Sequence, residues 1–84
     1  VNVLEPGFYY LDLNYSGQGR LVWRISTEEG SVVQNQQNSS ALYSEYPMGL
    51  IEFKTPGKHS VEVTLVEGDA KKSSLQWVSF TPVN

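Results

Sequence analysis

The chain contains no cysteine, a single histidine, and no apolar run near the length of a membrane-spanning helix. The lack of cysteine excludes a disulfide framework, and one histidine leaves no cluster of ligands for a structural zinc ion. A membrane helix needs roughly 20 consecutive apolar residues, so the sequence predicts no span, and nothing at its start is typical of a signal peptide. A membrane is therefore not an expected partner.

Basic residues are also scarce, since six Lys and Arg stand against nine Asp and Glu, a formal net charge of −3. They are dispersed rather than clustered, so nucleic acid is not an expected partner. At 84 residues, 39% of them hydrophobic, the chain can build one small core. Burial barely offsets chain entropy at this size. We therefore expect residues 1–84 to be a single accessory domain of a larger protein, supported by a neighbouring domain or another subunit.

A period of two in the apolar residues is the main structural signal. Such alternation predicts half-buried β-strands, and no helical period of useful length occurs. In residues 8–15 it separates an apolar face from a polar one: Tyr9, Leu11, Leu13 and Tyr15 against Tyr10, Asp12 and Asn14.

Further candidate strands follow at residues 20–25, 31–34, 50–53, 61–65 and 75–80. The turn at residues 16–19 predicts a hairpin between the first two strands, and the Pro-Gly turn at residues 56–57 predicts a second hairpin. Spacings of roughly 10 to 13 residues are typical of a sandwich or barrel. The sequence therefore predicts an all-β fold, a small antiparallel β-sandwich of the jelly-roll or galactose-binding-like kind.

Two segments are harder to place. Residues 34–40 contain no apolar side chain, and we expect a long surface connection there that continues to residue 47. In the last strand, Leu75 and Trp77 cannot point inward together with Val78 and Phe80 unless the strand contains a bulge.

Three segments in order resemble a known family: PGFYYLDLNY at residues 6–15, PGKHSVEV at 56–63 and LQWVSFTP at 75–82. Together they are similar to the scheme PGxYxLxLxY, PGxHxVxV, LxxIxLxP of galactose-binding-like β-sandwiches. The similarity is greatest to the C-terminal domains of bacterial family 29 α-L-fucosidases, and related patterns occur in carbohydrate-binding modules of families six and thirty-five. The three segments cover about a third of the chain directly.

This resemblance implies a non-catalytic accessory domain of a glycoside hydrolase, with the parent's catalytic domain as partner and oligosaccharide as a candidate ligand. The nucleophile and the acid/base of a fucosidase would belong to an upstream barrel. A secreted or periplasmic bacterial location follows from the same resemblance. Sugar-binding relatives often hold calcium, but this sequence contains no recognised calcium loop, and no cofactor is expected.

Residue patterns offer little for catalysis. His59 follows a turn at the start of a strand, and we expect a structural role for it. Glu28 and Glu29 are adjacent in a turn, whereas Glu52 and Glu62 would face each other across an exposed hairpin. All four carboxylates are therefore expected to be solvated surface groups.

Aromatic residues make up 12% of the chain and keep sugar recognition open, because rings stack on the C–H faces of sugars. Four of them fall on apolar faces and are expected in the core: Tyr9, Tyr15, Trp23 and Phe53. The candidate residues for carbohydrate binding or domain docking are Asn38, Tyr43, Glu45, Tyr46 and Trp77. Packing onto the domain itself also remains open for this loop, as does an immunoglobulin- or fibronectin-like spacer role for the whole chain.

Overall fold

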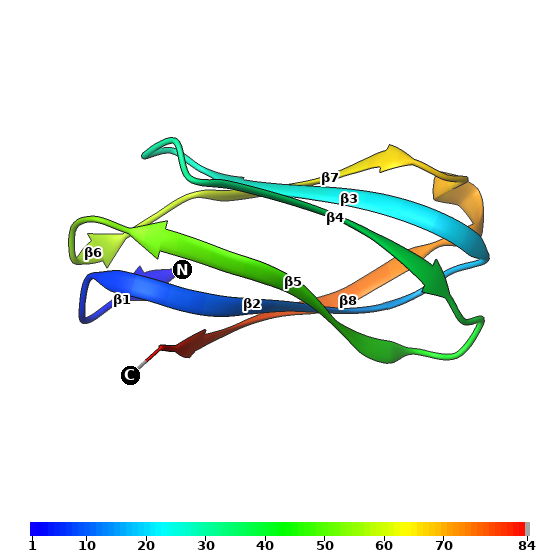
Figure 1. Cartoon of the computed structure of the whole chain (residues 1–84), viewed down its shortest axis with the longest axis horizontal. Coiled ribbons are helices and arrows are strands. Elements are labelled where there is room, and N and C mark those ends of the chain that lie inside the picture. Colours follow the sequence, from blue (N-terminus) through cyan, green and yellow to red (C-terminus); the bar gives the residue numbers. More distant parts are fainter. Residues whose placement is uncertain (84) are drawn as a thin grey trace.

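Two antiparallel three-stranded sheets face each other in the computed structural model, which describes residues 1–83 (Figure 1). The first sheet has the order β5 (Ser44–Phe53), β2 (Gly7–Ser16), β8 (Ser74–Pro82). The second has the order β4 (Val32–Ser39), β3 (Gly19–Thr27), β7 (Val61–Glu67). Two short strands, β1 (Asn2–Val3) and β6 (Gly57–Lys58), pair with each other, and one 3-10 turn, η1 (Ala70–Lys72), precedes β8. The predicted all-β sandwich is confirmed.

The core lies between the inner faces of the two sheets, as the alternation in the sequence predicts. Tyr15 is fully buried, stacks on Tyr46 with ring centroids 4.4 Å apart, and lies 5.3 Å from the ring of Trp23 in the opposite sheet. Phe53 is buried with edge contacts to Tyr9 at 5.6 Å. All four aromatics assigned to the core from the sequence therefore lie in it or packed against it.

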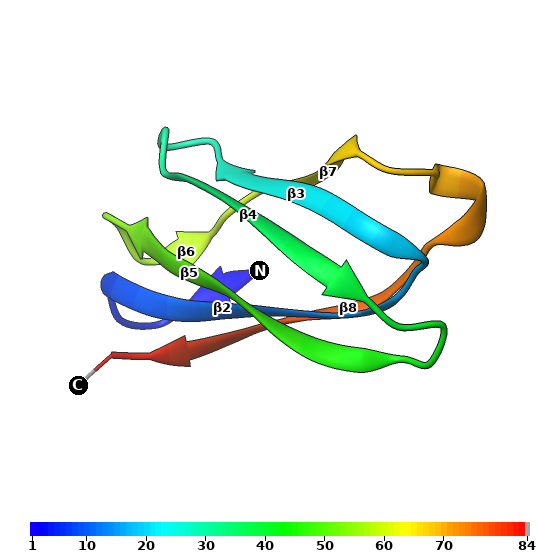
Figure 2. The ribbon, with the colours of Figure 1, turned by 45° about the vertical axis from the view of Figure 1, so that its right-hand side comes forward.

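Both predicted hairpins are wrong. The turn at residues 16–19 and the turn at residues 56–57 each carry the chain from one sheet to the other, so neither joins paired strands (Figure 2). The alternation of apolar and polar residues could not distinguish a hairpin within one sheet from a connection between the two sheets. In both cases the apolar face of each strand contacts the same core. As a result, Glu52 in β5 and Glu62 in β7 belong to different sheets and do not face each other. The hairpin that does form joins β3 to β4.

The predicted long connection over residues 34–47 is also wrong. Residues 32–39 form β4, which pairs with β3 from Gly19↔Ser39 to Ser26↔Val32, and β5 begins at residue 44. The inner side of β4 is polar because two of its amides serve the neighbouring sheet. Asn35 donates to the carbonyl of Met48 at 3.0 Å, and Gln37 donates to that of Pro47 at 3.1 Å. These bonds join β4 to β5 across the seam of the sandwich.

The last strand, where the direction of Trp77 was left open, contains a bulge. Asn14 lies opposite Trp77 and Tyr15 lies opposite Leu75, so Gln76 is the extra residue. The shift changes the side on which the following residues project. Val78 and Phe80 pack against the core, and Trp77 projects outward.

Candidate functional site

The outer face of the β5–β2–β8 sheet carries most of the exposed aromatic side chains. It is defined by the strand positions that alternate with the core positions. Along β2, β5 and β8 these positions are Phe8, Tyr10, Asp12 and Asn14, then Glu45, Pro47, Leu50 and Glu52, then Ser74, Trp77, Ser79 and Thr81. We call this surface the aromatic face.

Its rings are largely open to solvent. Tyr10 is 52% exposed, Trp77 is 50% exposed and Phe8 is 52% exposed, although large aromatics in so small a domain usually contribute to its core. Tyr43, in the short connection before β5, joins them. Its hydroxyl donates to Oγ of Ser74 at 2.9 Å, which holds the ring beside the start of β8.

Asn14 lies on the central strand of this surface, near the end of β2, between Glu45 on one side and Trp77 on the other. Only 8% of the residue is exposed, and its Oδ1 atom has no hydrogen-bond partner. Among residues 1–83 the other buried side-chain nitrogen or oxygen atom without a hydrogen-bond partner is Nε1 of Trp23, in the core. A buried acceptor without a donor costs about 1–3 kcal/mol, so a ligand that supplied a donor would recover that free energy.

The charge on the aromatic face is acidic. Asp12 and Glu45 flank the central amide, and Oε1 of Glu45 accepts a hydrogen bond from the hydroxyl of Ser79 at 3.4 Å. None of the outer positions in these three strands is Lys or Arg. The face therefore offers hydrogen-bond acceptors and ring surfaces, and it offers no cation to an anionic ligand.

The residues predicted from the sequence as one site lie in three places. Tyr43, Glu45 and Trp77 belong to the aromatic face or its rim. Tyr46 lies on the inner side, where it stacks on Tyr15 and its hydroxyl accepts the amide of Ser40 at 3.0 Å. Asn38 lies in the other sheet, where β4 pairs it with Arg20 of β3. It is exposed on the far face of the sandwich.

Tyr10 and Asn14 were not among the candidate residues. The period of two placed both on the polar side of their strand, and an aromatic ring on a polar side is the signal that could have drawn attention to Tyr10. The burial of Asn14 had no such signal, because it depends on strand neighbours that are distant in sequence.

A second cluster surrounds His59. Nδ1 of the imidazole lies 2.5 Å from Oε1 of Glu28, and Nε2 lies 2.7 Å from the carbonyl of Thr55. Glu29 accepts the amide of Lys54 at 2.8 Å. Glu28 is exposed, as predicted for a surface group, but its carboxylate is paired with His59. Glu29 is half-buried, and its carboxylate accepts hydrogen bonds from Lys54 and Thr55, so the prediction is wrong for Glu29.

The pKa values in this cluster follow from these contacts. The Thr55 carbonyl raises the pKa of His59, desolvation opposes the rise, and the Glu28 carboxylate adds to it. Desolvation raises the pKa of Glu28, but hydrogen bonds from its own amide, from His59 and from the amide of Ser60 together leave it below its usual value. Both imidazole nitrogens face acceptors, which favours the imidazolium form and leaves no free nitrogen to act as a catalytic base.

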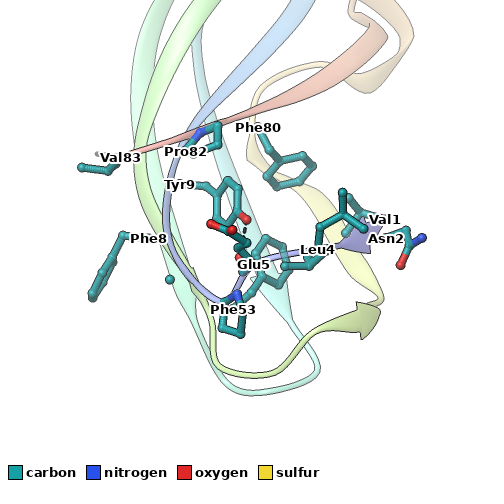
Figure 3. A pocket seen from close by; sticks show the side chains of 13 residues that line it. Val1, Asn2, Leu4, Glu5, Phe8, Tyr9, Phe53, Phe80, Pro82 and Val83 are labelled. Atoms are coloured by element: carbon teal, nitrogen blue, oxygen red, sulfur yellow. Dashed lines mark hydrogen bonds between the residues drawn. The ribbon is translucent and has the colours of Figure 1, made fainter.

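An apolar groove of about 560 Å³ opens beneath the N-terminal segment. Figure 3 shows the rings of Tyr9, Phe53 and Phe80 turned toward one another there, whereas Phe8 points away. The Tyr9 hydroxyl donates to the carbonyl of Glu5, so the main polar atom at this place is already engaged. The groove presents apolar surface without a converging set of polar groups.

Within the described part of the chain, no group of three or more His, Cys, Asp or Glu side chains is placed to hold a metal ion. Among residues 1–83, no helix is long and apolar enough to cross a membrane. Comparison with family models, curated proteins and solved structures finds no match.

Proposed function

We propose that this domain is a non-catalytic carbohydrate-binding module whose ligand lies across the aromatic face. The observation that carries the proposal is the buried Oδ1 of Asn14, an acceptor without a donor on the central strand of the aromatic face, beside the exposed ring of Trp77. A sugar hydroxyl can donate to this acceptor, but because the atom is buried, the hydroxyl reaches it only when a neighbouring side chain, Glu45 or Trp77, moves aside. Proteins rarely leave such an atom unpaired unless a ligand or an ordered water completes it.

The rings supply the second half of the recognition. Trp77 and Tyr10 are each half-exposed on outward strand positions, where a pyranose ring can stack its C–H face on them. Tyr43 adds a third ring near the start of β8. Stacking contributes affinity but does not distinguish one sugar from another. The polar side chains between the rings select among sugars by forming hydrogen bonds with their hydroxyl groups.

The charge of the surface supports a neutral ligand. Asp12 and Glu45 accept hydrogen bonds from hydroxyl groups, but they repel a carboxylate or a sulfate. We therefore expect neutral oligosaccharides to bind in preference to uronate-containing or sulfated ones.

The setting we propose is the C-terminal end of a bacterial glycosidase, an α-L-fucosidase in particular. The three sequence segments that resemble such domains support this setting, with catalysis assigned to a separate domain.

A docking role beside that domain is a second candidate, favoured by the adjacent exposed side chains of Phe8, Tyr10 and Leu50 at one end of the aromatic face. Such a patch suits a protein partner better than a polar sugar.

The test is a titration of the isotope-labelled domain with neutral oligosaccharides containing fucose, galactose or xylose, followed by NMR and tryptophan fluorescence. We expect saturable shifts at Asn14, Tyr10 and Trp77, which Trp77→Ala and Tyr43→Ala weaken. Asn38→Ala is the matched control, because that side chain is equally polar but lies on the far face. An acidic oligosaccharide should bind more weakly.

Two results would contradict the proposal. One is the lack of saturable shifts at millimolar concentrations of every neutral sugar. The other is a set of shifts confined to the face that contains Asn38. Binding of the isolated catalytic domain to Phe8 and Leu50, without any response to sugars, would favour the docking role instead.

A further inference from the structure

The two sides of the sandwich differ in how their edge strands are protected. On one side, Asn35 and Gln37 of β4 donate to carbonyl groups of β5, so the two sheets are joined there. On the other side, β7 and β8 are the last strands of their sheets, and η1 connects them at one end only (Figure 2). Within residues 1–83 no side-chain hydrogen bond joins β7 to β8.

Edge strands usually carry charges, prolines or bulges that discourage pairing with another chain. β5 contains Pro47 and two glutamates. β7 contains Glu62 and Glu67, and Glu67 pairs with Arg20 at 3.4 Å. β8, by contrast, runs for nine residues without a charged side chain, and its only proline is the last residue. Its single irregularity is the bulge at Gln76.

We propose that β8 pairs antiparallel with β8 of a second copy of this chain, so that two three-stranded sheets become one continuous sheet. A strand paired with its own copy about a two-fold axis must be antiparallel, and the start of each strand then lies beside the end of the other. Because β8 has no charged side chain, pairing it with its copy brings no like charges of the strand into contact.

The charges around β8 fit this arrangement. Lys71 and Lys72 precede the strand and outnumber Asp69, whose carboxylate caps the amide of Lys71. Glu5 lies with Pro82 at the groove beside the far end of the strand. Antiparallel pairing brings the basic start of one copy toward the acidic end of the other, whereas parallel pairing would bring the lysines together.

This pairing goes beyond sugar binding and does not depend on it. If both are correct, the aromatic faces of the two copies lie on one side of the joined sheet, with the two Trp77 side chains near its centre. Two sites on one rigid surface raise the effective concentration for a long oligosaccharide.

Sedimentation velocity over a range of concentrations tests the proposal by mass alone. We expect a concentration-dependent dimer for the wild-type chain. Gln76→Lys combined with Thr81→Lys places like charges on β8 at positions that approach each other across the axis, and dimer formation should weaken by about tenfold or more. Both side chains are exposed, so the fold should persist.

Val66→Lys is the matched control, because it places a lysine at an exposed position of the other open edge, β7. It should leave dimer formation unchanged. Concentration-dependent protection of β8 amides from hydrogen exchange is a second readout that needs no variant. A wild-type chain that stays monomeric at millimolar concentration overturns the proposal, as does a dimer that Val66→Lys disrupts and the β8 lysines do not.

Discussion

The imidazole of His59 contacts the carboxylate of Glu28 at 2.5 Å, although the two residues are 31 positions apart in the sequence. This contact joins the β3–β4 turn to the segment before β7. The backbone of His59 also exchanges two hydrogen bonds with Val1, at 2.8 and 2.9 Å. His59 therefore connects three parts of the chain: its backbone holds the N-terminal segment, and its buried side chain holds the β3–β4 turn and the segment that follows β5.

The first prediction concerns the protonation of this side chain. Because the Thr55 carbonyl and the Glu28 carboxylate both accept from the ring, the pKa of His59 should lie above 6.5. Glu28→Gln should lower that pKa, and Glu45→Gln, on the aromatic face, should not. His59 is the only histidine, so its ring signals can be followed by NMR without ambiguity. A midpoint at or below 6.5 in the wild-type chain would contradict this interpretation.

Stability should depend on pH through the same pair. Because the pKa of His59 is raised in the folded state, its protonation stabilises the fold fully below pH 6.5. This contribution is lost as the pH rises through the folded-state pKa. The lowered pKa of Glu28 stabilises the fold above 4.5, and this contribution is lost as the pH falls through its folded-state value. The contact therefore contributes most between pH 4.5 and 6.5.

Urea unfolding at pH values below, within and above that interval measures the effect. The free energy of unfolding should fall on the alkaline side for the wild-type chain, and His59→Gln should remove most of that slope. An unchanged slope in His59→Gln would show that another group causes it.

Two tyrosines that the sequence placed in one loop should behave differently. Tyr46→Ala removes a ring stacked on Tyr15 and should lower the free energy of unfolding by on the order of 3 kcal/mol. Tyr43→Ala removes a half-exposed ring and should change it by about 0.5 kcal/mol or less.

Tyr46→Phe separates the ring from its hydroxyl. It keeps the stacking and loses only the bond from the amide of Ser40, so we expect a loss of about 0.5–1.5 kcal/mol. Urea unfolding of the three variants checks the order. If Tyr43→Ala proved as destabilising as Tyr46→Ala, its ring would be part of the core and not of the aromatic face.

The sequence predicted the strands and their inner faces far better than the partners of those strands. Alternation in residues 8–15 identified Leu11 and Leu13 as core residues, and both are fully buried. The same alternation said nothing about which sheet each strand joins, because both sheets share one core. β4 was predicted only at its start, residues 31–34, for a related reason. Further along, its inward residues Asn35 and Gln37 are amides whose hydrogen-bond acceptors lie on β5, a contact between segments that no local pattern encodes.

The candidate site shows the same limit. Glu45 and Trp77 were selected for exposed polar and aromatic character, which a local reading can provide. That they flank one buried amide, Asn14, is a property of strand register. The bulge at Gln76 sets that register on one side, and from the sequence it was only a condition under which Leu75, Trp77, Val78 and Phe80 could all point inward.

The last prediction tests the seam where the sheets approach each other. Gly49 has φ of +136°, and a Cβ atom there would lie 2.8 Å from Cγ2 of Val33 in β4. Gly49→Ala should therefore destabilise the fold by about 1–3 kcal/mol through backbone strain, with a further loss from the clash. Gly30→Ala is the matched control, since its φ of +95° is also unfavourable but no atom lies within 4 Å of the added Cβ.

Val33→Ala removes the clashing methyl group and separates the two causes. In the double variant with Gly49→Ala, the clash is gone and the backbone strain remains, so the combined loss should be smaller than the sum of the single losses. Urea unfolding of the four chains gives the coupling free energy directly. Additive losses would mean that β4 and β5 do not approach each other as closely as the glycine indicates, and that the side chain of Val33 is not what requires glycine at this position.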